Sequence, residues 1–364
     1  MTVDIKQLPY RLGDLENAQT MWFTLTNRCN IHCKYCFNYL THDNEDMSPE
    51  MAVSILDYFS FKHNNRKKLH LIFFGGEPTI NHTALTAMLD YIRDTNLWCQ
   101  PHVMTNGIMH ESILERLIEA KTYFQISFDG FEDNLRVSKT GCAEKVTEHT
   151  VNTIKRVAAS NLAVHLRSTI HAGNVNSLCD IVTFAAENKV RSVAFAPICE
   201  FGEVIVNGVK QASPEEYVEQ LEKAIVLAKK RNVILDVRER KYFKTDVVND
   251  KVEIPLVWLP DGNLAMTITY ASSKIEAAKT IIIGKFDLKA KNIILYQPLI
   301  DEMNINFSRN LKANCANCPI VSRCKGLMCV TPYTTDTYIK ERDYYFCEIS
   351  RRMFGKLQAN ANLR

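Results

Sequence analysis

Met21-Trp-Phe-Thr-Leu-Thr26 is a run of apolar and β-branched residues, and Asn27-Arg-Cys29-Asn-Ile-His-Cys33-Lys-Tyr-Cys36 follows it directly. Such a run predicts a buried β-strand. The cysteines behind it place three thiols on one loop at the end of that strand. Where no secretion signal is present, clustered cysteines indicate a metal centre rather than a disulfide framework. The strand and the predicted metal site therefore adjoin in the sequence.

Extended apolar runs alternate with helical patterns from this point to about residue 235. We expect strands at Met21–Thr26, Leu69–Phe74, His102–Thr105, Tyr123–Phe128, Ala163–Ile170 and Ser192–Ile198. Apolar residues at helical spacing fill the gaps between these runs. Two helices have clear starts, at Ser48-Pro49-Glu50 and at Ser213-Pro214-Glu215-Glu216, where a serine caps and a proline occupies the first helical position.

Six β-then-α units in a row predict parallel strands with right-handed crossovers. Six units are too few for an eight-stranded barrel. We therefore expect an α/β fold, a partial (β/α)6 TIM-like barrel over residues 21–235, preceded by an N-terminal extension of residues 1–20. In such barrels the active site lies at the C-terminal ends of the strands, so each site motif should directly follow a strand.

The pattern changes in residues 236–364, which we expect to form a smaller, loop-rich α+β domain. The runs Leu256–Leu259 and Leu264–Thr269 flank Pro260-Asp261-Gly262-Asn263, which predicts a hairpin. A further short strand is expected at Thr280–Ile283, ending at Gly284. Five cysteines then lie between residues 315 and 347, and a metal centre there would supply part of the domain's stability.

Composition and charge narrow the class of protein. Apolar residues make up 46% of the chain and charged residues 23%, so a sizeable core is available. The net charge is +3, which gives no positive argument for nucleic acid or a membrane as the main partner. No apolar run is long enough to span a bilayer, and the N-terminus lacks the apolar core of a signal peptide. We expect a cytoplasmic protein.

Three thiolates on one loop suit a four-iron cluster, because they leave one iron free to bind another molecule. The alternative is a zinc site, which requires four ligands. His32 could serve as the fourth, but it is adjacent to Cys33 and poorly placed to share its metal.

The spacing Cys29-x3-Cys33-x2-Cys36, with Tyr35 before the last cysteine, resembles the signature of the radical S-adenosylmethionine (SAM) superfamily. The resemblance implies a [4Fe-4S] cluster that binds SAM and cleaves it reductively to a 5′-deoxyadenosyl radical. It also implies that SAM contacts lie in motifs that follow successive strands. These are Tyr35 in the cysteine loop, Gly75-Gly76-Glu77-Pro78, Asn106, Ser127 and Asp129.

Arg167 lies within the fifth expected strand, where an unpaired charge would be expensive. We expect it to bind the carboxylate of SAM, the alternative being an ion pair with Glu77 or Asp129. No residue stands out as the final hydrogen or proton donor. Cys142 and Cys199 are candidates by exclusion.

Cys315, Cys318 and Cys324, with the later Cys347, resemble the C-terminal SPASM domain of radical SAM enzymes. The resemblance implies one auxiliary [4Fe-4S] cluster on these four cysteines, with Cys329 as the alternative fourth ligand. A four-cysteine zinc knuckle is the competing interpretation. A second auxiliary cluster is not expected, because Ala265, Met266 and Thr267 stand where that family's hairpin carries a cysteine.

The resemblance implies an enzyme that abstracts hydrogen from a ribosomally made peptide or protein, leaving a crosslink, thioether, epimer or oxidised side chain. It also implies an electron donor such as flavodoxin or ferredoxin. Residues 1–20 are too few for a leader-peptide-binding domain, so a separate recognition protein is a further expected partner.

Three other functions stay open. One is a dehydrogenase of a sugar or small metabolite. Another is an anaerobic sulfatase-maturating enzyme, although Thr267 or Ile268 stands where that family has a catalytic aspartate. The last is a non-catalytic iron–sulfur sensor or scaffold.

Overall fold

The structure is a computed structural model of the 364-residue chain. It describes residues 18–38, 44–63, 67–132, 134–200, 202–243, 256–268, 270–302, 315, 317–324, 344–360 and 363. Cys329 and Thr269 lie outside the described residues.

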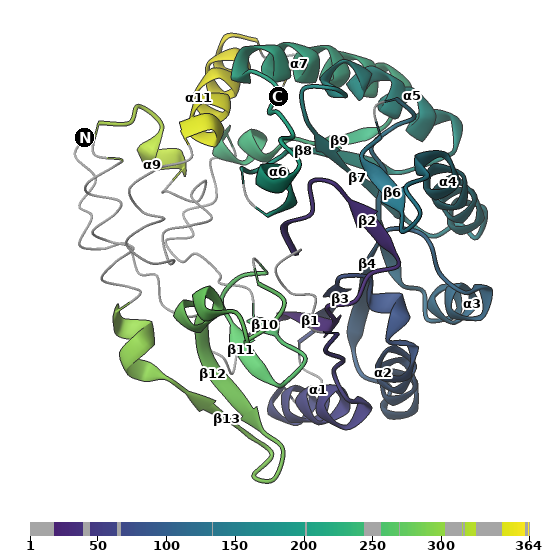
Figure 1. Ribbon diagram of the computed structural model, residues 1–364, viewed down its shortest axis with the longest axis vertical. Coiled ribbons are helices and arrows are strands. Elements are labelled where there is room, and N and C mark those ends of the chain that lie inside the picture. The colour runs from purple at the N-terminus through teal and green to yellow at the C-terminus, as the bar shows by residue number, and fades with distance from the viewer. Residues whose placement is uncertain are drawn as a thin grey trace.

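A curved sheet, parallel from β10 through β1 to β9 and antiparallel from β10 to β13, forms the centre of the molecule (Figure 1). Its strands run in the order β13-β12-β11-β10-β1-β3-β4-β5-β7-β8-β9. The six expected strands are β1 (Thr20–Thr26), β3 (Leu69–Gly75), β4 (Cys99–Thr105), β5 (Tyr123–Ser127), β7 (Val164–Ile170) and β8 (Ser192–Pro197). Each is parallel to its neighbours. The predicted α/β partial barrel is therefore confirmed.

Helices connect these strands along the outer side of the sheet (Figure 1). They are α1 (Pro49–His63), α2 (His82–Thr95), α3 (Glu111–Glu119), α4 (Ala143–Ala159), α5 (Leu178–Glu187) and α7 (Pro214–Arg231). The short α6 (Glu203–Val206) lies instead beside the cysteine loop, because the Glu203 amide donates to the Cys36 carbonyl. Both predicted serine caps form. Ser48 Oγ accepts from the Met51 amide at 3.1 Å, and Ser213 Oγ accepts from the Glu216 amide at 3.1 Å.

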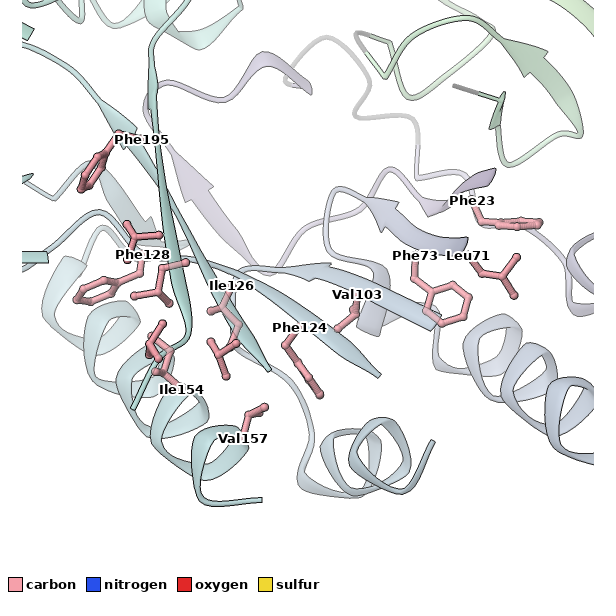
Figure 2. Packing of buried hydrophobic residues seen from close by; sticks show 14 of the residues in the cluster. Phe23, Leu71, Phe73, Val103, Phe124, Ile126, Phe128, Ile154, Val157 and Phe195 are labelled. Carbon is pink, nitrogen blue, oxygen red and sulfur yellow. The ribbon is translucent and has the colours of Figure 1, made fainter. Parts of the chain in front are cut away.

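The main core fills the layer between sheet and helices. Phe73, Val103, Phe124 and Ile126 project from neighbouring strands toward the helices, where Ile154 and others meet them (Figure 2). Alternate residues on the same strands face the inner side of the sheet, because side chains on a strand alternate between its two faces. The inner side is thereby left for a site.

The C-terminal part extends the same sheet. The hairpin β10 (Leu256–Trp258) and β11 (Asn263–Ala265) is antiparallel as predicted, and β12 (Ile282–Asp287) and β13 (Asn292–Leu295) continue it. β10 also lies parallel to β1, which joins the two parts through backbone hydrogen bonds. Beyond β13 the chain is helical at residues 297–302, and the helices α9 (Val321–Cys324) and α11 (Tyr344–Ala359) follow.

Three details differ from expectation. The strand expected at Thr280–Ile283 is β12, which starts at Ile282 and runs past Gly284 to Asp287 because it pairs on both sides, with β11 and β13. A further strand, β9 (Ile234–Asp236), lies parallel to β8, so the expected boundary at residue 235 falls inside a strand. The two-stranded sheet of β2 (Ile31–Cys33) and β6 (Arg136–Ser138) was also not predicted.

Two glycines hold the ends of β1 and β3 together. A Cβ atom on Gly75 would lie 2.0 Å from the Thr26 carbonyl oxygen, and one on Gly76 would lie 2.3 Å from the Arg28 carbonyl oxygen. The Gly76 amide donates to the Thr26 carbonyl at 2.9 Å, and the Glu77 amide donates to the Arg28 carbonyl at 2.8 Å. The backbone that these glycines admit is thus that of the cysteine loop itself.

Among the described residues, no helix is long and apolar enough to cross a membrane.

Trp258 is the side chain that most clearly joins the two parts. It is fully buried, lies opposite Phe23 of β1, and packs edge-on against Phe59 and Phe286 with ring centroids 6.2 Å away in each case. We expect Trp258→Ala to lower the free energy of unfolding by about 3–5 kcal/mol through the cavity it leaves. Urea denaturation measures this. Trp98→Ala, at a half-exposed tryptophan, is the matched control and should stay within about 0.5 kcal/mol. Equal losses would contradict this role.

Gly76→Ala tests the contact between β3 and the cysteine loop. The added methyl would press on backbone atoms of Asn27 and Arg28. We therefore expect the free energy of unfolding, measured by thermal denaturation, to fall by about 1–3 kcal/mol, as at an overpacked site. We also expect less iron after anaerobic reconstitution. Gly355→Ala is the control, because nothing lies within 4 Å of its added methyl. A Gly76→Ala protein as stable and iron-rich as this control would rule the contact out.

Candidate active site

The cysteine loop begins where β1 ends, and each of the other expected motifs also follows a strand, as predicted. Residues 31–33 pair antiparallel with residues 136–138, which places Cys33 directly opposite Arg136. The Lys34 amide donates to the Leu135 carbonyl at 2.9 Å, and the Cys36 amide donates to the Cys33 carbonyl at 3.0 Å. The loop that carries the thiols is therefore braced by the segment after β5.

The three thiols act on one another electrostatically. Burial raises the pKa of Cys33 well above its ordinary value, Arg136 opposes this, and the neighbouring Cys36 and Cys29 add to it. Burial, followed by the Glu77 carboxylate, raises the pKa of Cys29. Among the described residues, no three His, Cys, Asp or Glu side chains are grouped for a single metal ion. A cubane makes a different demand, because each cysteine binds a different iron.

Glu77 is fully buried and joins the loops after β3 and β4. Its Oε1 accepts from the Thr79 hydroxyl at 2.7 Å and from the Thr105 hydroxyl at 2.8 Å. Its Oε2 accepts from the Asn106 amide at 2.7 Å. Burial raises the pKa of Glu77, and these hydrogen bonds oppose that shift. The carboxylate is thus engaged in positioning its neighbours, and Pro78 begins the turn of 3-10 helix beside it.

Asn106 links this junction to the cysteine loop. Its side-chain amide donates to the Asn30 side-chain oxygen at 2.7 Å and lies 3.7 Å from the Cys29 sulfur. This contact lowers the pKa of the Cys29 thiol, against the larger effect of burial. An amide donor directed at a cysteine sulfur is a feature that tunes iron–sulfur clusters.

Asp129 holds Tyr35, the residue before Cys36. The Tyr35 hydroxyl donates to the Asp129 carboxylate, whose other oxygen accepts from the Thr169 amide at 2.8 Å. Burial raises the pKa of Asp129, and Arg136 opposes that shift. Asp129 is therefore bound to protein groups on both of its oxygens.

Arg136 is a site residue that sequence reasoning missed. It is fully buried, and its Nη2 donates to the Asn106 carbonyl at 2.7 Å. Its Nε and Nη1 have no hydrogen-bond partner among the described residues. Burial opposes its charge, yet Tyr35, Asp129 and Cys33 raise its pKa overall. The sequence feature that could have indicated Arg136 is its position between the apolar residues Leu135 and Val137. An arginine in a buried apolar segment needs partners for its charge.

Arg167 and Ser127 lie elsewhere on the sheet. They are paired in register on β7 and β5, facing the inner side. Arg167 makes no ion pair with Glu77 or Asp129, because those carboxylates are engaged by Thr105, Asn106, Tyr35 and Thr169. That alternative is therefore wrong. The charged and polar groups that act on Arg167 are Arg238, Tyr217, Asp236 and Cys199.

The segment after β8 supports the cysteine loop from its other side. The Glu203 amide donates to the Cys36 carbonyl at 3.0 Å, and the buried Glu203 carboxylate lies 3.2 Å from His32 Nε2. A Cβ atom on Gly202 would lie 2.7 Å from the Cys36 carbonyl oxygen. Glu203 could not be recognised from sequence, because its contact with Cys36 joins residues far apart in the chain.

Cys318 and Cys324 lie in a small apolar cluster with Ile320 and Phe346. Cys315 and Cys324 are buried, and the Cys318 amide donates to the Cys315 carbonyl at 2.9 Å. Arg351 on α11 has both Cys318 and Cys347 among its charge neighbours. α11, which carries Phe346 and Cys347, therefore packs against the segment that holds Cys318 and Cys324.

The two thiols named by exclusion differ in position. Cys142 caps the start of α4 and donates to the Glu144 carboxylate at 3.3 Å. Cys199 is exposed just after β8 and is one of the groups that act on Arg167. Cys199 is thus the one associated with the inner side of the sheet.

Residues 23–185 match the family model of the Radical SAM superfamily. Among curated relatives, the radical SAM cyclopropyl synthase TigE of Paramaledivibacter caminithermalis is 27% identical over 50% of this chain and 42% of its own length. The PqqA peptide cyclase of Methylobacterium nodulans is 25% identical over 50% and 47%. The chain spans about half the length of the curated relatives it matches.

Solved structures share the fold over most of the chain. The structure of anSMEcpe with bound AdoMet and the Cp18Cys peptide has a TM-score of 0.71 and 16% identity, covering 94% of this chain and 97% of that one. Streptococcus suis SuiB bound to S-adenosylmethionine has a TM-score of 0.59 and 15% identity, covering 89% and 77%. The residues that match the family model, 23–185, include the cysteine loop and the strands from β1 to β7.

Proposed function

We propose that the chain is a radical SAM enzyme with its [4Fe-4S] cluster on Cys29, Cys33 and Cys36. The observation that carries the proposal is that the loop of three cysteines pairs with β6, where Cys33 lies opposite the buried Arg136, whose Nε and Nη1 have no partner among the described residues. When bound, the cluster and SAM supply the reductive cleavage that yields a 5′-deoxyadenosyl radical. The residues of the chain hold, orient and shield these groups.

The residues around the thiols suit a cluster with one open iron. Thiolates of Cys29, Cys33 and Cys36 would bind three irons and leave the fourth for SAM. The Asn106 amide directed at Cys29 would stabilise negative charge on that sulfur. Arg136 supplies a buried positive charge next to Cys33, which would otherwise be costly to deprotonate in this environment.

We assign the carboxylate of SAM to Arg136 rather than to Arg167. Arg136 has two donor nitrogens without a protein partner, and it lies across a two-stranded ribbon from a cluster cysteine. A guanidinium with free donors suits a carboxylate, which it can bind through two hydrogen bonds. The other residues proposed to surround SAM are unchanged: Tyr35, Gly75, Gly76, Glu77, Pro78, Asn106, Ser127 and Asp129. Among these, Glu77 and Asp129 would act by positioning the loops.

The proposed substrate is a peptide or protein. Support comes from relatives and neighbours whose names include a PqqA peptide cyclase, anSMEcpe with a bound peptide, and SuiB bound to precursor peptide SuiA. An electron donor such as flavodoxin or ferredoxin and a separate recognition protein belong to the same proposal. A sugar or metabolite dehydrogenase is the second candidate, favoured by the polar inner face of the sheet described below.

We further propose an auxiliary [4Fe-4S] cluster on Cys315, Cys318, Cys324 and Cys347. The packing of Cys318 and Cys324 against Phe346, the residue before Cys347, and the hydrogen bond from the Cys318 amide to the Cys315 carbonyl support it. Four thiolates would complete the coordination of such a cluster, so its role would be electron transfer or shaping of the substrate site. Zinc on the same four cysteines is the alternative that metal analysis distinguishes.

The test is anaerobic reconstitution followed by incubation with SAM and dithionite. We expect about eight irons per chain, two cubanes, and release of 5′-deoxyadenosine. The variant with Cys29→Ala, Cys33→Ala and Cys36→Ala should keep about four irons, because its auxiliary cysteines are intact. It should release no 5′-deoxyadenosine, because it lacks the cluster that binds SAM. Cys99→Ala is the control, since the pKa of that thiol is raised to about 11 by burial away from the loop. 5′-Deoxyadenosine from the triple variant would refute the proposal.

A further inference from the structure

The inner side of the sheet is accessible along its central strands. The exposed fractions of residues on β4, β5 and β7 alternate, with buried residues facing the helices and partly exposed ones facing inward. The inward set is largely polar and includes His102, Gln125, Ser127, Arg167 and Thr169. An interior face that is polar and partly open has the character of a ligand site rather than of a packed core.

Arg167 is the charged residue in the middle of this face. Its neighbours in register are Ser127 on β5 and the small Ala194 on β8. Its guanidinium makes no hydrogen bond or ion pair with any residue that the structure describes. Burial, and then the charge of Arg238, lower its pKa. A half-buried arginine without a partner is costly, and a bound anion would remove that cost.

A second arginine, Arg238, acts on Arg167. Arg238 follows β9, and its Cζ lies 5.9 Å from the centre of the Phe346 ring. Asp236 is exposed and forms no ion pair with Arg167 within 4.0 Å, whereas the nearby Glu239 carboxylate accepts from the Ser350 hydroxyl at 2.8 Å. The positive charge of Arg238 thus acts on Arg167, and no carboxylate of the described residues pairs with the Arg167 guanidinium.

This pair is separate from the cations near the cluster. The largest electrostatic effects on Arg136 from other side chains come from Tyr35, Asp129 and Cys33, whereas those on Arg167 come from Arg238, Tyr217, Asp236 and Cys199. Each arginine site therefore has its own surroundings. If Arg136 binds the carboxylate of SAM, Arg167 is left for a different anion.

We propose that Arg167, assisted by Arg238, binds a carboxylate of the substrate on the inner face of the sheet. That this anion belongs to the substrate rests on the proposed function. The carboxylate would come from an acidic side chain or from the C-terminus of a peptide, and it would fix the substrate beneath the SAM site. The chemistry of recognition is the same for both sources, a charge-assisted pair of hydrogen bonds from the guanidinium.

Arginine labelling with phenylglyoxal tests the proposal without a known substrate. Reconstituted wild-type protein saturated with SAM is labelled anaerobically in the presence of one of three probes at equal concentration. N-acetyl-L-alanine carries a terminal carboxylate, N-acetyl-L-glutamate α-methylamide a side-chain carboxylate, and N-acetyl-L-glutamine methylamide none. We expect at least one carboxylate probe to slow labelling of Arg167 about fivefold relative to the neutral probe, as an occupied charge-assisted pair would.

The carboxylate probe that slows labelling of Arg167 more identifies the source of the carboxylate, a C-terminus or an acidic side chain. Arg93 is the internal control, because it is exposed and already paired with Asp90 and Asp94, so its labelling should not change. In the wild type, the carboxylate probe that protects Arg167 should also slow labelling of Arg238. In the Arg167→Gln variant, this protection of Arg238 should be lost. Equal Arg167 labelling with all three probes, or undiminished Arg238 protection in the variant, overturns the proposal. Release of 5′-deoxyadenosine by the unlabelled wild type reports separately on the proposed function.

Discussion

The site depends on the close backbone approach between the end of β3 and the loop after β1. Gly75 and Gly76 lack the Cβ atoms that would collide with the carbonyls of Thr26 and Arg28. The close approach allows two backbone hydrogen bonds, from the Gly76 amide to Thr26 and from the Glu77 amide to Arg28. The cysteine loop is thereby fixed at its first residues, before any metal binds. β2, β6 and the segment at Glu203 fix its remaining length. A rigid loop can hold three thiols in a constant relation to the strands.

Buried charges around the loop compensate one another. Glu77 is satisfied by hydroxyl and amide donors, Asp129 by Tyr35 and Thr169, and Arg136 by a carbonyl and by neighbouring anionic groups. Removing one partner from such a network costs more than the pair contributes, because the other charge is left buried and unpaired. The two unused donors of Arg136 are the place where this network is open to a ligand.

Local patterns predicted the parallel barrel, the serine caps and the hairpin, because each depends on residues close in sequence. They also predicted that site motifs follow strands, since parallel strands share one C-terminal edge. Arg136 and Glu203 were missed because their importance comes from β2–β6 pairing and from a contact across 167 residues, between Cys36 and Glu203. Arg167 was recognised as an arginine that needs a partner, but register and burial, rather than sequence, show which groups surround it.

The central claim is that an iron held by the loop of Cys29, Cys33 and Cys36 binds SAM directly. Electron–nuclear double resonance on the reduced protein, with SAM labelled at the methionine amino nitrogen and carboxylate oxygens, tests it most directly. A variant lacking Cys315, Cys318 and Cys324 leaves one cluster to observe. We expect hyperfine coupling of both labels to the cluster. A reduced cluster whose spectrum is unchanged by saturating labelled SAM would contradict it.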